Sequence, residues 1–503
     1  MDSTETELKL AVDAALLDRI PRLPAIARNK TGRAKTQQLC STYYDTPEME
    51  LQKAGITLRL RQGGGLWLQT VKNSGDRTAG LFERREWEID VPLGQIHLPH
   101  LLATGLSPFR QQGLPERLRP VFTTEIRRTL HILATPDWEI ELALDRGEII
   151  AGTQRSAVSE IEMELRRGPS LALFDMAQAI AAALPCRLQS QSKSDRGFGL
   201  AGNGELKPVK AAPLALTADM KVASAFQVIA RNCLHHLLAN EAALRGNHAA
   251  EAVHQARVAL RRLRSAIKVF KPLLAGPQLP PLRQELRWLL AHLGPARDGD
   301  VFLAEILKPV LCRHPDAPAL PQLYGEWQEQ RDRDFAAAVA AVDDNRFTLL
   351  LLRLGHWVTA AEWHAPALAD TRLDDFARRV LKRTHHRLIK AGGNNLAHLP
   401  TEELHQVRII GKQMRYAGEF FASLYPRSAS KPFLNLLADL QENLGGLNDL
   451  AVAGPRLARS HHRGDWAWAA GLICGWHETR RPGLLRQAQA TWKLLRKATP
   501  FWR

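Results

Sequence analysis

Charged residues at every second position are the first feature of this sequence that suggests chemistry. In the segment TETELKL, residues 4–10, Glu5, Glu7 and Lys9 alternate with uncharged residues. Period-two alternation is typical of a β-strand, so all three charged side chains would point to one face. Carboxylates and an ammonium group on one face could hold a metal ion and a phosphate together.

Further segments share this alternation and place charges on one side of an expected strand. They contribute Arg59 and Arg61 in GITLRLRQ, Arg84, Glu86 and Glu88 in FERREWEI, and Glu160, Glu162 and Glu164 in SEIEMEL. Neighbouring carboxylates repel one another and need cations beside them. Carboxylate oxygens suit Mg²⁺ or Mn²⁺, whereas Arg and Lys suit phosphate. A solvated charged face is the alternative for any single strand, but the whole set favours a site for a metal–oligophosphate complex.

A second pattern is an internal repeat in the later part of the chain. AVHQARVALRRLRSAIKVF, residues 252–270, aligns with ELHQVRIIGKQMRYAGEFF, residues 403–421, at an offset of 151. The same offset relates HLGPARDGDV, residues 292–301, to NLGGLNDLAV, residues 443–452. A constant offset over this length indicates duplication of a structural unit.

Each copy of the repeat carries a basic ridge with helical spacing beside an apolar seam. The ridges comprise His254, Arg257, Arg261, Arg264 and Lys268 in the first copy and His405, Arg408, Lys412 and Arg415 in the second. An isolated basic ridge is commonly a solvated face. This ridge occurs twice and has almost no acidic partners, so it predicts a surface that binds an anion. The two histidines are candidates for binding or for orienting helices, and both readings stay open.

Charge and pattern divide the 503 residues into two parts. Residues 1–203 have a formal net charge of +1, whereas residues 204–503 have +15. The first part alternates with period two, which predicts an antiparallel sheet or barrel, with helices near 11–19 and 171–184. The segment around 204–217 is rich in Gly, Pro and Lys and predicts a linker. From 218 the spacing is helical to residue 503.

Composition limits the classes of partner that residues 204–503 could bind. A strongly basic region implies nucleic acid, a membrane surface or polyphosphate as a partner. The basic ridges lack interleaved aromatic residues, which disfavours nucleic acid, and no apolar run is long enough to span a bilayer. The five cysteines are far apart, without metal-ligand spacing, and predict reduced thiols in a cytoplasmic protein.

An ordered series of motifs makes residues 1–203 resemble the CYTH family, the triphosphate tunnel metalloenzymes. The series contains ETELK, which is similar to the ExExK signature, then YYDTP (43–47), LRLR (58–61), Lys72, RREWE (84–88), Arg128, LALDRGEI (142–149), EIEMEL (160–165) and SKSDRG (192–197). The resemblance implies an antiparallel barrel that forms a tunnel. It also implies hydrolysis of a triphosphate or, in one branch of the family, cyclisation of ATP.

The resemblance also implies roles for particular residues. The metal ligands, for two Mg²⁺ or Mn²⁺ ions, would be Glu5, Glu7, Asp145, Glu160, Glu162 and Glu164, with Glu86 and Glu88 as further candidates. The phosphate-binding catalytic residues would be Lys9, Arg59, Arg61, Lys72, Arg84 and Arg128, with Lys193 and Arg196 closing the site. Arg127 competes with Arg128 for the inward position, and the sequence leaves that choice open.

Residues 218–503 resemble CHAD, the conserved histidine α-helical domain. This resemblance implies a pair of duplicated four-helix bundles, about 218–345 and 370–500, with a basic channel that binds inorganic polyphosphate. The whole chain resembles CYTH–CHAD inorganic triphosphatases. We therefore predict hydrolysis of tripolyphosphate to pyrophosphate and phosphate in the cytoplasm, with polyphosphate granules as one candidate location. The alternatives are ATP or thiamine triphosphate as substrate, or a non-catalytic polyphosphate-binding protein; the oligomeric state stays open.

Overall fold

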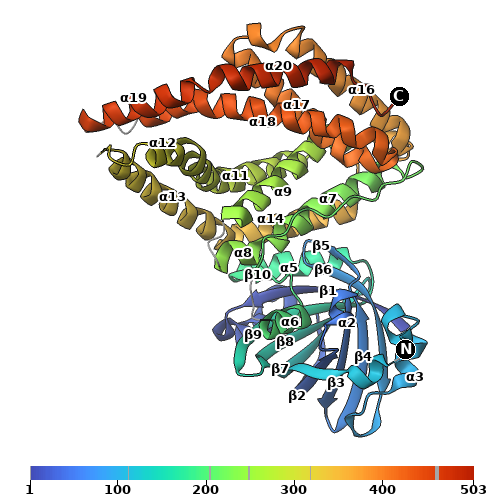
Figure 1. Cartoon of the computed structure of the whole chain (residues 1–503). Coiled ribbons are helices and arrows are strands. Elements are labelled where there is room, and N and C mark those ends of the chain that lie inside the picture. Colours follow the sequence, from blue (N-terminus) through green and yellow to red (C-terminus); the bar gives the residue numbers. More distant parts are fainter. Residues whose placement is uncertain (1, 112, 203–205, 247–249, 318, 459–463) are drawn as a thin grey trace. The chain divides into compact units, whose positions relative to one another are not determined.

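Two compact units make up the computed structural model, which describes residues 2–111, 113–202, 206–246, 250–317, 319–458 and 464–503 (Figure 1). Unit 1 consists of Met1–Lys207 and Val342–Ala360, and unit 2 consists of Pro208–Ala341 and Ala361–Arg503. Unit 1 contains the strands of the described chain, and unit 2 is helical. This confirms the predicted fold class of a β-rich part followed by an α-helical part.

Eight antiparallel strands of unit 1 close into a barrel. Their bounds are β1 (Asp2–Val12), β2 (Lys30–Asp45), β3 (Ile56–Gly63), β4 (Leu66–Asn73), β6 (Leu81–Asp90), β7 (Arg119–Ala134), β8 (Glu139–Ala151) and β9 (Gln154–Arg167). The order around the barrel is β1-β9-β8-β7-β2-β3-β4-β6, and β6 pairs back to β1. Two short strands, β5 (Asp76–Thr78) and β10 (Cys186–Leu188), extend the sheet at its margins. The barrel therefore has no long unpaired edge.

Helices cover the outer, apolar face of the barrel. Short helices α2 (Glu50–Lys53), α3 (Leu98–Ala103) and α4 (Leu114–Arg117) contribute to a cluster that buries Leu58, Val71 and Trp87. Residues on these strands that alternate with the apolar ones must then point into the barrel. The charged faces recognised in the sequence are thus interior faces.

A helix from the predicted helical domain 218–503 belongs to unit 1, and it falls between the two predicted bundles, about 218–345 and 370–500. Helix α14 (Asn345–Ala360) packs along α5 (Leu171–Ala183). Asn345 accepts a hydrogen bond from the Cys186 backbone and donates one to the Ala181 carbonyl, at 3.2 and 2.5 Å. Because α5 is apolar on nearly every side, it needs a cover besides the barrel, and α14 provides it.

Unit 2 repeats three helices at the offset seen in the sequence. The first set is α7 (Val222–Ala239), α9 (Ala250–Val269) and α11 (Leu279–Val301), and the second is α16 (Leu373–Gly392), α17 (Thr401–Phe421) and α18 (Arg427–Leu457). Shifting the first set by 151 residues places it on the second. The longer helices after each set differ: α12 (Lys308–Arg313) and α13 (Ala319–Asp343) follow the first set, and α19 (Gly464–Glu478) and α20 (Arg481–Lys497) follow the second. The duplication is therefore clearest in the three helices that carry the repeated motifs.

The predicted linker, residues 204–217, is bound to the surface of unit 2 where it is described. Val209 exchanges hydrogen bonds with Asn240, at 2.8 and 2.9 Å, and its carbonyl contacts His236 at 3.0 Å. Asn232 donates to the Ala212 carbonyl. Residues 203–205 lie outside the described part. None of the described helices is both long and apolar enough to cross a membrane.

Candidate active site and basic channel

The register of the barrel strands places cations directly opposite carboxylates. Glu5 lies opposite Arg84, Lys9 opposite Glu162, and Lys72 opposite Glu86. Arg128 lies opposite Asp145. Opposite charges on adjacent strands attract, so these pairs compensate one another, although the register also places Glu7 opposite Glu164 and Asp145 opposite Glu160.

The barrel interior has an apolar end and a charged end. At the apolar end, Tyr43, Phe122, Ile126 and other residues pack against Phe198 of α6 (Lys193–Ala201). Gly197 of α6 lies so close to the Phe122 ring that a Cβ atom would approach it to 2.1 Å. A larger residue there would push α6 away from the barrel. The apolar packing thereby fixes the first turn of α6, which carries Lys193.

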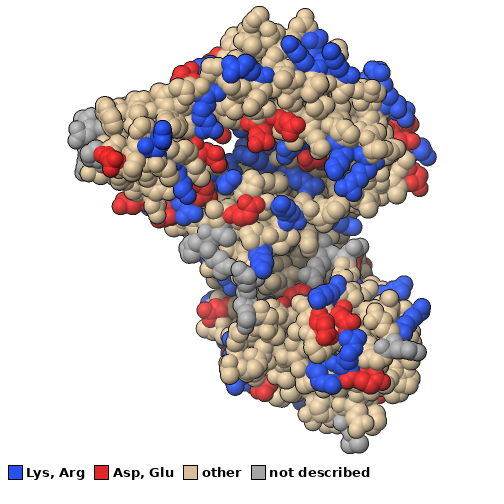
Figure 2. Space-filling model, viewed as in Figure 1, with Lys and Arg blue, Asp and Glu red and all other residues tan. Residues whose placement is uncertain are grey.

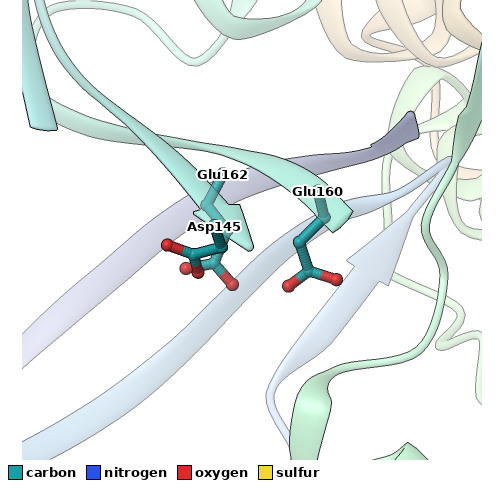
Figure 3. Close-up of side chains that lie close together, drawn as sticks. All are labelled: Asp145, Glu160 and Glu162. Carbon is teal, nitrogen blue, oxygen red and sulfur yellow. The ribbon is translucent and has the colours of Figure 1, made fainter. Parts of the chain in front are cut away.

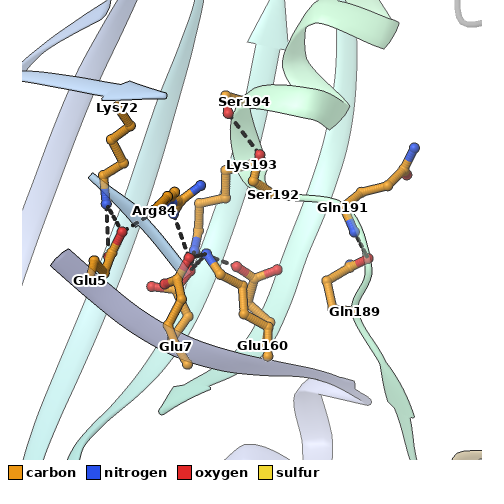
Figure 4. Close-up of polar contacts among 12 residues, drawn as sticks. Glu5, Glu7, Lys72, Arg84, Glu160, Gln189, Gln191, Ser192, Lys193 and Ser194 are labelled. Atoms are coloured by element: carbon orange, nitrogen blue, oxygen red, sulfur yellow. Dashed lines mark hydrogen bonds and ion pairs between the residues drawn. The ribbon is translucent and has the colours of Figure 1, made fainter. Parts of the chain in front are cut away.

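Lys193 lies among three carboxylates from β8 and β9. Its Nζ donates to Asp145 at 2.6 Å, to Glu162 at 3.0 Å and to Glu160. Figure 3 shows these three carboxylates projecting from neighbouring strands, and Figure 4 shows Lys193 beside Glu160. Arg128 donates to Asp145 at 2.6 and 2.7 Å and to Glu162. Burial favours the neutral form of Glu162, but the nearby lysine and arginine charges outweigh burial. They hold the pKa of Glu162 well below its ordinary value.

A second group of ion pairs surrounds the first strand. Lys72 donates to Glu5 at 2.7 and 2.8 Å, and Arg84 donates to Glu5 at 2.8 Å and to Glu7 (Figure 4). Burial opposes ionisation of Glu5, but Lys72 and Arg84 prevail and lower its pKa. Both acidic residues of the first segment are therefore held in fixed positions by cationic side chains.

Two arginines of β3 have weaker partners than the other interior cations. The nearest carboxylates to Arg59 are Glu86 and Glu88, both at 3.7 Å. Arg61 forms only a 3.4 Å hydrogen bond to Ser41, and no described carboxylate lies within 4.0 Å of it. Burial, together with Arg59 and Arg128, lowers the pKa of Arg61 to about 10. These guanidinium groups are therefore the interior cations best suited to receive an added anion.

Unit 2 contains two adjoining cavities that share Arg261 and Lys412, and we call them together the basic channel. Its ten cationic residues are Arg257, Arg261, Arg264, Lys268, Arg283, Arg287, Arg297, Arg408, Lys412 and Arg456. Its carboxylates among the described lining residues are Asp298 and Asp449. Figure 2 shows Lys and Arg side chains around a hollow on this unit. Burial, and then Arg408 and Arg261, lower the pKa of Lys412 to about 8.

The comparisons with known proteins agree with this division. The CYTH domain family matches residues 3–198, and the CHAD domain family matches residues 228–458. The CHAD domain structure from the plant Ricinus communis is 35% identical, with a TM-score of 0.52, and the match covers 58% of this chain and 99% of that one. The chain is a CYTH–CHAD protein.

Two curated relatives extend the comparison. An inorganic triphosphatase of Haemophilus influenzae is 34% identical over 196 residues, which are 39% of this chain and 54% of the relative. This chain therefore covers about half of that protein's length. An uncharacterised protein of Mycobacterium tuberculosis is 28% identical over an alignment of 452 positions that covers 82% of each chain. The second match extends across both domains.

The donor set of the CYTH domain fits a divalent cation. One oxygen each of Asp145, Glu160 and Glu162 lies within 4.8 Å of the others. Glu160 also has a buried oxygen, Oε2, that forms no hydrogen bond. Carboxylate oxygens of this kind are ligands for hard divalent ions. Lys193 contacts the same three carboxylates, so an ion bound there would share them with its ammonium group.

The structure brings most of the predicted residues of the CYTH domain to one charged cavity. Those that line it are Glu5, Glu7, Lys9, Arg59, Arg61, Lys72, Arg84, Glu86, Glu88, Arg128, Glu162, Glu164 and Lys193. Asp145 and Glu160 lie behind it and touch Lys193. Arg196 does not line the cavity; it donates to Ser156 and the Ala157 carbonyl, and it lies 3.6 Å from Oε2 of Glu160. The sequence left open whether Arg127 or Arg128 points inward. Arg128 lines the cavity, whereas Arg127 is exposed.

Several cavity residues were not selected from the sequence. Glu141 and Arg166 are in phase with selected residues of β8 and β9, so period two could have found them. Arg166 pairs with Glu141 at 2.7 Å and with Glu164 at 2.8 Å. Burial, and then Glu5 and Glu141, raise the pKa of Glu164 to about 7 despite Arg166. Tyr43 also lines the cavity. Burial acts to raise the pKa of Tyr43, but the charges of Arg59 and Arg61 outweigh burial and lower it.

In the CHAD domain, seven of the nine predicted residues line the basic channel and two do not. His405 faces a different cavity and contacts Asn448 at 2.8 Å, whereas His254 lines the channel. Arg415 pairs with Glu419 at 3.0 Å and lies over the Tyr416 ring. The sequence search missed Arg283, Arg287, Arg297 and Arg456, which lie on the helices that follow each ridge.

Proposed function

We propose that this protein is a metal-dependent inorganic triphosphatase that hydrolyses tripolyphosphate to pyrophosphate and phosphate in its CYTH domain. The observation that carries the proposal is the cavity of eight cations and seven carboxylates inside a closed barrel. Binding alone would not need so many carboxylates. The similarity to an inorganic triphosphatase of Haemophilus influenzae supports the same activity.

Charge balance supports a requirement for metal. The cationic and acidic side chains of the cavity nearly cancel before substrate enters. A triphosphate carries several negative charges, so its entry into this enclosed space needs added positive charge. We propose Mg²⁺ or Mn²⁺, two per site, with Asp145, Glu160 and Glu162 holding one ion and Glu5, Glu7 and Glu164 near the other. A bound ion would supply charge neutralisation on the phosphates and polarisation of the attacking water.

The side chains of the chain itself would orient the substrate. Arg59 and Arg61 would bind phosphate oxygens, because their present partners are weak. Lys9, Lys72, Arg84 and Arg128 would hold the carboxylates ionised and share their remaining donors with phosphate. This arrangement would keep the phosphoanhydride chain straight for in-line attack.

For the CHAD domain we propose binding of inorganic polyphosphate in the basic channel. The excess of ten cations over two carboxylates supports binding of a flexible, densely charged anion. The described lining contains few aromatic rings on which nucleic-acid bases could stack. A cytoplasmic protein, located where polyphosphate accumulates, would suit this pairing of activities.

Phosphate release from tripolyphosphate, ATP and thiamine triphosphate tests the enzymatic proposal. Each substrate is offered with Mg²⁺, Mn²⁺ or EDTA. We expect metal-dependent release that is fastest from tripolyphosphate, and loss of release in Glu5→Ala and Glu7→Ala. Undiminished hydrolysis by these variants would overturn the proposal. Polyphosphate binding without release from any substrate would instead favour a non-catalytic binding protein.

A further inference from the structure

A second cationic surface lies on helix α16, outside the basic channel. We define the α16 stripe as Arg379, Lys382, Arg383, His386 and Lys390, all of which are exposed. Their spacing of three and four residues places them on one side of the helix. From Arg379 to Lys390 the stripe extends about 16 Å at 1.5 Å per residue.

The cations of this stripe have no acidic partners in the described structure. No described carboxylate lies within 4.0 Å of the side-chain nitrogens of Arg379, Lys382, Arg383 or Lys390. By contrast, Arg378 on the flank of the helix pairs with Asp375 at 3.7 Å. Like charges four residues apart destabilise a helix by a few tenths of a kcal/mol per pair. A solvated face would normally interleave acidic residues and avoid that cost.

Packing within unit 2 places α16 next to the helices of the basic channel. Phe376 of α16 stacks near Phe270 and Phe421, with ring centroids 5.0 and 6.3 Å away. These rings join α16 to the ends of α9 and α17, which supply much of the channel lining. In the C-terminal half of α16, Arg387 is close enough to Lys268 that, after burial, its charge contributes to lowering the pKa of Lys268. Lys268 itself lines the channel, so Arg387 of α16 lies within electrostatic reach of a channel residue.

We propose that the α16 stripe is an external binding track for long-chain inorganic polyphosphate. A long polyphosphate bound in the basic channel would extend out of it and along the stripe. This inference rests on the proposed polyphosphate binding and extends it from the channel to the outer face of α16. A polyphosphate has regularly spaced negative charges and no bases, so it needs closely spaced cations and no stacking surface. The stripe offers such spacing, and the one aromatic ring of α16 besides its histidines, Phe376, is buried. Figure 2 shows Lys and Arg side chains over the part of this unit where Figure 1 labels α16 and α20.

The experiment compares two chain lengths and three variants of the full-length protein. The stripe variant combines Arg379→Gln, Arg383→Gln and Lys390→Gln. The channel variant combines Arg261→Gln and Lys412→Gln. A control variant removes three exposed cations elsewhere in unit 2 through Lys308→Gln, Arg313→Gln and Arg486→Gln. Binding of size-fractionated short-chain and long-chain polyphosphate, and of duplex DNA, is measured with EDTA present, over a range of salt concentrations.

The expected results separate the stripe from the channel. The stripe variant should bind long chains about tenfold more weakly and short chains normally, because only long chains reach the stripe. For long chains, the slope of log affinity against log salt concentration should become shallower by about two in the stripe variant, because three phosphate contacts are lost. The control variant should match the original protein at both lengths. The channel variant should lose affinity for both lengths.

Each other outcome has a defined meaning. If the stripe variant binds long chains as the control variant does, the external track is wrong, although channel binding still stands. If it loses affinity for both lengths equally, the stripe is not an extension and the inference is also wrong. A loss of DNA binding without any loss of long-chain polyphosphate binding would assign the stripe to nucleic acid. An unaffected channel variant would instead overturn the proposed polyphosphate function itself.

Discussion

The barrel cavity and the basic channel use the same residue types in opposite ways. The cavity encloses about 160 Å³, and its eight cations face seven carboxylates. The channel consists of cavities of about 440 and 470 Å³, in which ten cations face two carboxylates. Balanced charge in a small space holds groups in fixed positions and leaves room for metal ions, whereas unbalanced charge in a larger space attracts an anion. In the proposed function, the first arrangement suits chemistry and the second suits binding.

The largest expected effect is on the stability of the barrel. Arg128→Gln should lower its free energy of unfolding by about 3 kcal/mol, because Asp145 and Glu162 lose a buried partner. Urea unfolding of the barrel gives the measurement. Arg127→Gln, one residue away and exposed, is the matched control and should change it by less than about 0.5 kcal/mol. Equal effects of the two variants would show that the interior ion pairs contribute no special stability.

The next effect is on catalysis. Arg61→Gln should lower kcat/KM for tripolyphosphate by about 10²- to 10³-fold, as for other donors that stabilise developing charge. Stability should be retained, because Arg61 has no described carboxylate partner whose charge would be left unpaired. Steady-state phosphate release together with an unfolding curve measures both. Gln62→Ala changes the neighbouring exposed residue and should have little effect. Normal activity of Arg61→Gln would remove this residue from the phosphate site.

A smaller effect is expected in the channel. Arg261→Gln should weaken polyphosphate binding by about tenfold, because its side chain lines both cavities. Arg415→Gln removes the same charge from a ridge residue that pairs with Glu419 outside the channel, so its affinity should change little. Isothermal titration with polyphosphate in EDTA distinguishes them. Equal losses would mean that net charge, and not the channel lining, determines binding.

The smallest effect is a pH dependence. Because the pKa of Lys412 is lowered to about 8, this lysine loses its charge between pH 7 and pH 9. Polyphosphate binding favours the protonated form, so affinity should fall by roughly fivefold over this range as one contact is lost. In Lys412→Arg the charge persists, and the fall should disappear. An unchanged pH profile in that variant would assign the titration to another group.

The sequence identified the cavity well where charged residues follow period two. Glu5, Glu7 and Lys9, or Glu160, Glu162 and Glu164, share a face of one strand, and a closed barrel turns that face inward. Arg196 has suitable chemistry, but the first turns of α6 direct it to the edge of β9. Its direction depends on how α6 packs, which no local pattern contains.

Other features needed tertiary information. The sequence did not single out β2, whose first half is exposed on both faces and therefore lacks an apolar alternation. His254 and His405 occupy equivalent repeat positions, yet only the first lines the channel, because their surroundings differ. The assignment of α14 to unit 1 depends on the apolar surface of α5, more than 160 residues earlier in the chain.

The most direct test of the account measures hydrolysis and binding on the same two variants. Glu162→Gln removes a carboxylate from the barrel site, and the combined Arg261→Gln and Lys412→Gln variant removes two channel cations. Phosphate release from tripolyphosphate with Mg²⁺ and binding of polyphosphate in EDTA are measured for each. We predict that the first variant binds but does not hydrolyse, and that the second hydrolyses but binds weakly. Hydrolysis by the barrel variant, or its loss in the channel variant, would contradict the separation of chemistry from binding.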